Sequence, residues 1–271
     1  MIKKRISIIC MYTFLSIAAF LSLFPLYWTI VSATNTNPDI LSATLTPGTN
    51  LLENFRNLTA GWNIGQAFWN STRNSVTLTV LSVLICSMAG YGFEVFHSKA
   101  KDRLMSILLL SMMIPFAAIM IPLFSITADL GLLGTTLGFI LPTLATAFLI
   151  MLFRQSARYF PSDMIEAARI DGLSEVGIFF RMFVPTMKST FAAAIVITFM
   201  GAWNSYLWPV IIFRPFQEAH TMPLVISNII AGYVTDYGVL MLSVLIATFP
   251  TIVIFFLLQR YFAEGIVGTI K

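Results

Sequence analysis

The sequence predicts an all-α membrane protein with six transmembrane helices, and composition, apolar run length and charge placement lead to this class. Mean hydropathy is +0.85, 58% of the residues are hydrophobic and only 10% are charged. A helix needs roughly 20 mostly apolar residues to cross about 30 Å of hydrocarbon. Six runs of this kind occur, at about 8–31, 74–93, 104–127, 132–153, 189–213 and 237–258.

The first apolar run is expected to remain in the protein as a helix. It is longer than the apolar part of a signal peptide and lacks a small-residue cleavage site. The two cysteines, Cys10 and Cys86, both lie inside apolar runs and form no CxxC spacing. We therefore expect neither a disulfide framework nor a metal site.

The distribution of Lys and Arg predicts the orientation of the chain. If the N-terminus is cytoplasmic, 13 of the 16 basic residues fall in cytoplasmic segments and only Arg56, Arg73 and Arg214 fall outside. Short cytoplasmic loops carry an excess of Lys and Arg, so both termini are predicted to be cytoplasmic. The net charge of +4 then reflects topology, and no nucleic-acid partner is expected. We expect a single transmembrane domain over residues 1–271, with a cytoplasmic loop at about 154–188.

The first half of the chain adds an outer loop and two kinked helices to this outline. The loop at about 32–72 is rich in turn residues and carries Trp62, Phe68 and Trp69, which suit an interfacial belt or contact with an external partner. The second helix is expected to begin at Arg73–Asn74. Proline kinks membrane helices where neighbouring groups satisfy the freed carbonyls. Pro115 and Pro122 are therefore expected to kink the third helix, and Pro142 lies in the fourth.

The second half contains a polar interruption of the fifth helix and a second outer loop. The stretch Gly201–Pro209 places Trp203, Asn204, Tyr206 and other polar groups inside an apolar run. The outer loop follows at about 214–236. The sixth helix then returns the chain to a short cytoplasmic tail. His97 and His220 are both expected in solvated loops.

The cytoplasmic loop holds nine of the chain's 28 charged residues within 35 positions. It predicts two short helices with a break between them. Asp163 and Glu166 have the spacing of a capping box, with Pro161 just before them, and Gly172 suits the C-terminal stop. In the second helix we expect one apolar face. Its members are Val176, Phe179, Phe180 and Phe183, and Pro185 ends the helix.

Small and charged residues alternate in the first of these helices. Ala167, Ala168 and Gly172 let another backbone come close, while Glu166 and Asp171 offer charge pairing. A short exposed helix of this kind suits insertion into a partner's groove. A solvated loop with ordinary caps is the alternative on the residues alone.

The loop resembles a known family. EAARIDG, Glu166–Gly172, with Ile178–Phe179 and Pro185, is similar to the cytoplasmic EAA loop of binding-protein-dependent ABC importer permeases, in particular the maltose-transporter-like carbohydrate group. Gly131–Thr135 resembles the outer turn of that group, and Gly201–Asn204 with Trp208–Pro209 resembles its fifth helix. The tail from Tyr261 to Lys271 resembles the end of the subunit that reaches the ATPases. The resemblance implies the ABC type I importer permease fold.

The resemblance also implies partners and site residues. Glu166 and Asp171 would be charged contacts to an ATPase, and Ala167, Ala168 and Gly172 would give close fit. The tail residues Gly265, Gly268 and Lys271 would lie between permease and ATPases. The implied partners are a second permease, making a heterodimer, two ATPase subunits, a solute-binding protein that meets the outer loop 214–236, and the bilayer of a prokaryotic plasma membrane.

No catalytic role is expected for this chain. It contains no GxxxxGK[ST] phosphate loop. It is therefore expected to be a transport subunit and not an enzyme, with no cofactor of its own. ATP and Mg²⁺ would be used by the partner ATPases.

The predicted substrate path uses Asn74, Trp203, Asn204 and Tyr206. Sugars offer hydroxyls and apolar C–H faces, which amides and aromatic rings can recognise. Interhelical hydrogen bonding is the alternative for Asn74 and Asn204. A neutral di- or oligosaccharide is the expected substrate. A glycerol 3-phosphate or phosphodiester importer is the alternative, but a phosphate would favour basic groups in mid-membrane, and none is evident.

Two other classes compete with an ABC permease. An ion-coupled secondary transporter usually carries ionisable groups deep in the membrane. Here Glu94, Asp129 and Asp236 fall at span ends or in turns. A non-transporting membrane scaffold is the second competitor, and the kinking prolines and the polar centre of the fifth helix argue against it.

Overall fold

The computed structural model describes residues 2–232 and 235–268, with side chains described for 7–232 and 235–261. Within these ranges helices and their connections make up the fold and no strand occurs, which confirms the predicted all-α class. The chain divides into two compact units. One comprises Met1–Gly65 with Val225–Phe249, and the other comprises Gln66–Leu224 with Pro250–Lys271. The prediction of one domain over residues 1–271 stays a prediction.

Two asparagine side chains, the buried Asn54 and the half-buried Asn37, connect elements of the first unit. It contains α1 (Ile2–Ala33), α2 (Asn37–Leu41) and α3 (Leu51–Gly61), with parts of α14 (Met222–Ile230) and α15 (Tyr237–Gly268). Asn54 donates to the carbonyls of Ala33 and Asn35 at 3.0 and 3.1 Å. The Asn37 side chain accepts from the backbone N–H of Tyr237 at 2.8 Å. The expected outer loop 32–72 is therefore an ordered pair of short helices fastened to the start of α15.

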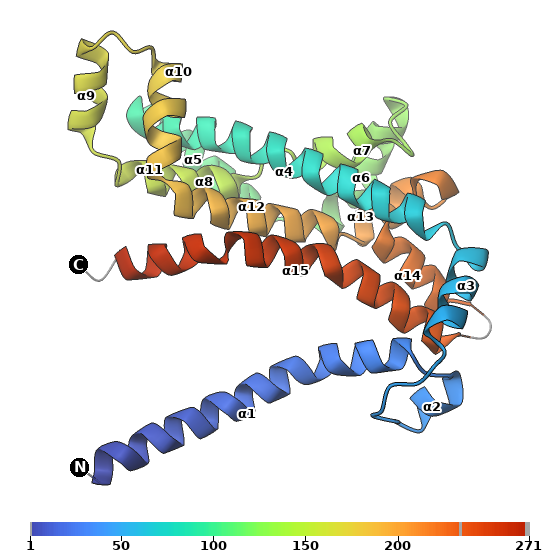
Figure 1. The fold of residues 1–271 in the computed structure, drawn as a ribbon. Coiled ribbons are helices and arrows are strands. Elements are labelled where there is room, and N and C mark those ends of the chain that lie inside the picture. The colour runs from blue at the N-terminus through green and yellow to red at the C-terminus, as the bar shows by residue number, and fades with distance from the viewer. Residues whose placement is uncertain (1, 233–234, 269–271) are drawn as a thin grey trace. The chain divides into compact units, whose positions relative to one another are not determined.

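The second unit carries most of the remaining helices (Figure 1). It begins within α4, and its principal elements are listed here in chain order. They are α4 (Ile64–Val95), α5 (Lys99–Ser111), α6 (Phe116–Asp129), α7 (Thr136–Ile140), α8 (Ala147–Arg158), α9 (Ser162–Ile170), α10 (Glu175–Ile178), α12 (Lys188–Trp203) and α13 (Leu207–Phe213). Short turns complete it: η1 (Leu141–Thr143), the π-helical η2 (Phe179–Phe183), α11 (Val184–Thr186) and η3 (Gln217–Ala219).

Within the described part of the chain, three continuous helices are long and apolar enough to cross a membrane, at Ser7–Ala33, Ile64–Val95 and Tyr237–Tyr261. Three bent helix pairs also qualify if each counts as one span, with bends of 98°, 53° and 85°. They are Lys99–Ser111 with Phe116–Asp129, Thr136–Thr143 with Ala147–Arg158, and Glu175–Thr186 with Lys188–Trp203. The number of six spans and the cytoplasmic placement of both termini stay predictions.

The sharpest of these bends lies at Pro115. The residue caps α6 at its N-terminus, in extended conformation, so the expected kink is a complete break between α5 and α6. Pro122 lies inside α6, which continues through it. The second helix begins at Ile64, well before the expected Arg73, because the polar residues Asn70, Ser71 and Asn74 are buried and do not interrupt α4.

A close contact between α4 and α8 depends on Gly90. A Cβ atom at this position would lie 2.6 Å from Phe153 Cβ and 2.7 Å from both Arg154 N and Ile150 O. Two of these three atoms are backbone, so the neighbour could not move aside cheaply. Small residues of this kind let membrane helices approach closely, and Gly90 therefore sets the separation of α4 and α8.

Arg154 joins the ends of three helices. Its side chain is 4% exposed and pairs with Glu94 of α4 at 3.1 Å and Asp102 of α5 at 2.5 Å. Arg158 adds a second pair with Glu94 at 3.3 Å. His97 is 54% exposed, as expected of a loop residue, but it also pairs with Asp102 at 2.9 Å. Buried charges are found paired, and these pairs tie α4, α5 and α8 together.

Candidate functional site

Helix α9, which carries most of the EAARIDG stretch, has one buried and one exposed face. Ile165 and Ala168 are 7% and 4% exposed and pack in a cluster with Tyr91, Phe160, Phe179 and Phe183. Glu166 and Ala167 lie on the exposed side, followed by the exposed Asp171 and Gly172. Ala168 was expected at the partner surface. The structure places it inward, one turn after Ile165, so its small size lets α9 lie close to its own support.

Gly172 ends α9 in the way that the sequence predicts. Its φ is +80°, a conformation that residues with a Cβ rarely adopt. The N–H of Gly172 donates to Arg169 O at 3.1 Å, and the N–H of Leu173 donates to Ala168 O at 2.9 Å. These two bonds form a Schellman motif. It fixes the direction in which the chain leaves α9.

The predicted capping box is wrong. The N-cap of α9 is Pro161, and no side chain caps this end. Asp163 therefore lies inside the first turn, where its charge still suits the helix dipole. Asp163 and Glu166 have the spacing of a capping box, but the helix begins directly after the extended Pro161. Its N-cap therefore lies two residues before Asp163 in the chain.

The predicted single apolar face of the second short helix is also wrong. Phe179 and Phe183 are 3% and 0% exposed, whereas Val176 and Phe180 are 58% and 47% exposed. Phe179 and Phe183 are four residues apart and share one face, and Val176 and Phe180 share another. The segment Phe179–Phe183 is a π-helical turn, and only the face of Phe179 and Phe183 packs against the core. Pro185 does not end the helix on its own, since α11 contains it and the break follows at Met187.

An ion pair joins α9 to α10. Arg169 Nε donates to Glu175 Oε1 at 2.6 Å, and both side chains are about two-fifths exposed, at 42% and 39%. This hydrogen bond raises the pKa of the Arg169 guanidinium above its usual range. Figure 1 shows α9 and α10 side by side, joined by the turn at Gly172. The pair makes the two short helices one unit.

The exposed face around α9 is more apolar than the charges in the sequence suggest. Ile170 is 86% exposed, Tyr159 is 82% exposed and Met164 is 38% exposed. These residues were not predicted from the sequence. The available signal was an isoleucine placed directly before the Asp-Gly end of the helix.

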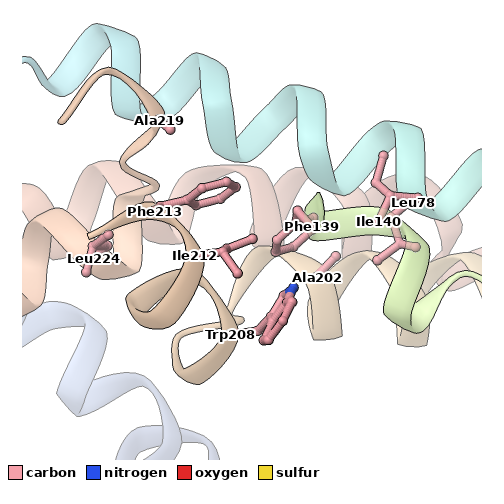
Figure 2. Close-up of a cluster of buried hydrophobic side chains, with 9 residues drawn as sticks. All are labelled: Leu78, Phe139, Ile140, Ala202, Trp208, Ile212, Phe213, Ala219 and Leu224. Carbon is pink, nitrogen blue, oxygen red and sulfur yellow. The ribbon is translucent and has the colours of Figure 1, made fainter. Parts of the chain in front are cut away.

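A cavity of about 370 Å³ lies within the second unit. The two helix breaks contribute to it, since Thr143 and Thr146 flank the break before α8 and Ser205 lies between α12 and α13. Phe139 and Trp208 form part of its wall and belong to the buried cluster drawn in Figure 2. The indole N–H of Trp208 donates to Gly138 O at 3.0 Å, which fixes its ring.

The cavity combines hydroxyl groups with aromatic rings. Most of its wall is apolar, and polar groups are set into it. The Thr198 hydroxyl is buried and has no hydrogen-bond partner among the described residues. The hydroxyl-bearing lining residues are Ser82, Thr143, Thr146, Thr198 and Ser205, and the aromatic ones are Phe116, Phe139, Phe148 and Trp208. Apolar sites with a few placed polar groups are typical of small-molecule binding.

The predicted path residues are not among the residues that line this cavity. Asn74 is 1% exposed and accepts from Thr136 at 3.0 Å, while its Nδ2 is buried without a described partner. Trp203 is 2% exposed and stacks on Phe199. Asn204 and Tyr206 are exposed at the helix break, and Asn204 donates to Met200 O at 2.9 Å. Their role in a path stays a prediction.

The second outer loop is fastened to α4. Asn70 Nδ2 donates to Glu218 O at 2.7 Å and to His220 O at 3.0 Å. The Ser71 hydroxyl accepts from the N–H of Met222 at 2.8 Å. The sequence analysis did not assign these two polar residues. Their bonds hold the exposed part of the loop in one arrangement.

The remaining predicted residues lie in the tail. Gly265 and Gly268 belong to α15, and Lys271 lies outside the described residues. Among the described residues no group of three or more His, Cys, Asp or Glu side chains could hold a metal ion.

Comparison with known proteins gives consistent findings. The family described as "Binding-protein-dependent transport system inner membrane component" matches residues 82–268. The chain is 43% identical to the lactose transport system permease protein LacG of Rhizobium radiobacter, over all of this chain and 98% of that protein. It is 33% identical to the arabinooligosaccharides transport system permease protein AraQ of Bacillus subtilis (strain 168), over 97% of this chain and 95% of that protein.

A more distant relative and a solved structure extend these findings. The chain is 31% identical to the sn-glycerol-3-phosphate transport system permease protein UgpE of Escherichia coli, over 96% of each chain. A crystal structure of a bacterial ABC transporter involved in the import of the acidic polysaccharide alginate matches with a TM-score of 0.82 and 19% identity. That match covers 96% of this chain and 98% of the other, and it supports the fold.

Proposed function

The chain belongs to the family of binding-protein-dependent transport system inner membrane components, and on that premise we propose that it is the membrane-spanning subunit of an ATP-driven importer for a neutral di- or oligosaccharide. It forms the translocation path with a second, non-identical permease in a prokaryotic plasma membrane. Two ATPase subunits, which use ATP and Mg²⁺, drive it from the cytoplasm. An external solute-binding protein delivers the sugar at the outer loop 214–236.

The observation that carries this proposal is the exposed helix α9 with its fixed end at Gly172. An exposed short helix fits a groove on a partner. Glu166, Ala167, Asp171 and Gly172 lie on the exposed side and supply the ATPase contacts. Ala168 anchors α9 on the permease itself. Movement of the ATPases is then transmitted through α9 to the helices on which it packs.

The tail provides a second contact with the ATPases in this proposal. Gly265 and Gly268 in α15, and Lys271 beyond the described residues, lie between the permease and the two ATPase subunits. Glycines permit close backbone approach. The EAARIDG helix and the tail thus act together at the cytoplasmic side.

The cavity supports a neutral polyhydroxylated substrate. Its hydroxyls can exchange hydrogen bonds with sugar hydroxyls, and its aromatic walls suit the C–H faces of a sugar ring. The proposed path also includes Asn204 and Tyr206, at the break between α12 and α13, and the buried Asn74 and Trp203. No Lys, Arg or His is among the lining residues of the cavity, whereas bound phosphate is usually met by such groups. A neutral sugar is therefore favoured over glycerol 3-phosphate, the alternative suggested by the similarity to UgpE.

Purification of the tagged chain in mild detergent tests the proposal. We expect a second permease and an ATPase pair to be recovered with it. ATP hydrolysis is then measured with the binding protein and with lactose, an arabino-oligosaccharide or glycerol 3-phosphate. Stimulation by a neutral sugar supports the proposal, and stimulation by glycerol 3-phosphate alone transfers it to the alternative.

Two outcomes would contradict an ABC permease altogether. If the chain purifies without any ATPase, the result supports the interpretation as a non-transporting membrane scaffold. Uptake in proteoliposomes driven by an ion gradient and independent of ATP would return the secondary transporter.

A further inference from the structure

Two buried oxygen atoms without described partners occur where α4 and α10 carry Tyr91 and Glu175. The Tyr91 hydroxyl and Glu175 Oε2 are both shielded from solvent, and neither has a hydrogen-bond partner among the described residues. Buried polar atoms in folded proteins are nearly always hydrogen-bonded, so each exception requires an explanation. One of these atoms belongs to a donor and the other to a carboxylate acceptor. They are chemically complementary.

The Tyr91 side chain is held by the segment that follows Glu175. Tyr91 is 4% exposed and lies near the C-terminal end of α4. Its ring centroid is 5.4 Å from that of Phe179 and 5.0 Å from that of Phe183. Both phenylalanines belong to the π-helical turn directly after α10. The ring of Tyr91 therefore contacts the same short segment that carries Glu175.

Glu175 already connects two elements through its other oxygen. Oε1 accepts from Arg169 of α9 at 2.6 Å, while Oε2 remains without a partner. Glu175 lies four residues before Phe179, whose ring contacts that of Tyr91, so Glu175 is on the face of this segment that Tyr91 contacts. Glu175 is thus one hydrogen bond short of connecting α9, α10 and α4 in a single chain of contacts.

The surroundings allow the segment to shift by a small amount. The turn at Phe179–Phe183 is π-helical, a form that is found mostly as single turns and often at functional sites. A break at Met187 and a bend of 85° separate it from α12. Movement of α10 relative to α4 therefore requires no rearrangement of a continuous long helix.

We propose that Tyr91 and Glu175 are positioning residues of the coupling mechanism, because the Tyr91 hydroxyl donates to Glu175 Oε2 in a conformation of the transport cycle other than this one. In that conformation Arg169, Glu175 and Tyr91 link α9 directly to α4. In the present conformation the link is open. The hydrogen bond between Tyr91 and Glu175 thereby stabilises the conformation in which a movement of α9 is transmitted to α4. This inference rests on the proposed function.

The Tyr91→Phe variant tests the proposal in the assembled transporter. It keeps the ring packing against Phe179 and Phe183 and removes only the hydroxyl. We expect ATP hydrolysis stimulated by binding protein and sugar to fall on the order of 10-fold, the size expected for one hydrogen bond to a charged group. Basal hydrolysis and the thermal unfolding midpoint of the resting transporter stay unchanged. A purely structural role would lower the midpoint and both activities together.

Two further variants sharpen the test. Tyr12→Phe is the control, because Tyr12 is 62% exposed on α1 and belongs neither to the exposed face around α9 nor to the α9–α10 pair. Glu175→Ala removes the acceptor. The double variant Tyr91→Phe/Glu175→Ala should be no worse in stimulated hydrolysis than Glu175→Ala alone, since both remove the same bond. Additive losses would overturn the inference.

The outcomes separate this inference from the proposed function. Wild-type complex that responds to binding protein and sugar, with Tyr91→Phe equally responsive, overturns the inference alone. Wild-type complex that shows no response overturns the proposed function and the inference with it. A responsive wild type, a selective loss in Tyr91→Phe and an unaffected Tyr12→Phe support both.

Discussion

Ile170 has the largest exposed fraction of the big apolar side chains in the described chain, at 86%. It stands one turn after Glu166, and Met164 and Ala167 continue its face along α9. An apolar side chain this exposed on an aqueous surface gains from burial against a partner. At residue scale the proposed coupling surface therefore has an apolar centre rimmed by the charges of Glu166 and Asp171, a typical arrangement for an interface.

Substitution of Ile170 should weaken binding to the ATPase subunits in proportion to the side chain removed. Burying an isoleucine contributes about 2 kcal/mol, so we expect Ile170→Ala to weaken association roughly 10- to 30-fold. Ile170→Val should lose only a small part of this. The measurement is binding of purified ATPase to the permease in detergent. Equal affinities across wild type, Ile170→Val and Ile170→Ala would contradict the assignment.

Substitution of Gly172 should uncouple the permease without preventing its insertion. Gly172→Ala places a Cβ at φ +80°, which costs about 1 kcal/mol, and should lower uptake partially. Gly172→Pro also removes the N–H that bonds to Arg169 and should abolish uptake. Gly177→Ala is the control, because Gly177 has no positive φ and its Cβ would meet only Ser174 Oγ at 3.3 Å. Membrane content of each variant is measured beside uptake, and normal uptake by Gly172→Pro would refute the assignment.

At the scale of elements, the sequence predicts where apolar helices lie but not where they break. The runs around 8–31 and 237–258 coincide with continuous helices, which continue through Pro25 and Pro250. The run at 189–213 contains the polar Asn204 and Ser205, and α12 ends at Trp203 while α13 begins at Leu207. These polar residues mark the break, but the Trp208 bond to Gly138, which holds α13, is a tertiary contact that no local pattern contains.

The candidate site was predictable to a similar extent. Gly172 could be predicted because helices often end at a residue with positive φ, which glycine adopts most easily. Glu166 could be predicted because charged residues are rare in this apolar chain. The cavity residues could not be assigned in this way. Thr143, Thr198 and Ser205 come from different elements, and serine and threonine are common in membrane helices for packing alone. Only the fold brings their hydroxyls to one cavity.

Arg154 should be far more important for stability than its neighbour Arg158. Arg154→Ala leaves Glu94 with Arg158 alone and Asp102 with His97 alone, and each lost hydrogen bond between charged groups costs about 1.5–3 kcal/mol. Arg158 is 47% exposed, and a surface pair of this kind contributes at most about 1 kcal/mol. Thermal unfolding of each variant in detergent measures the difference. Similar midpoints for Arg154→Ala and Arg158→Ala would show that the three helix ends are held by other contacts.

For the molecule as a whole, the distribution of Lys and Arg predicts on which side of the membrane each proposed site lies. The basic residues of α5, α8 and α9 fall on the predicted cytoplasmic side, as does the EAARIDG helix. Coupling to ATPases requires this orientation, and delivery by an external binding protein requires loop 214–236 on the opposite side. The assignment of both contact sites therefore depends on the predicted topology.

Single-cysteine labelling tests this topology in cells. Cys10 and Cys86 are first replaced by serine, and cysteine is then introduced at one of four exposed positions, Thr59, Lys99, Ser162 or Gln217. The positive-inside distribution predicts that a membrane-impermeant maleimide labels Thr59→Cys and Gln217→Cys in intact cells. Lys99→Cys and Ser162→Cys should be labelled only after permeabilisation, which also serves as the control for reactivity. Labelling of Ser162→Cys in intact cells would place α9 outside, where no ATPase could reach it, and the coupling role of EAARIDG would have to be abandoned.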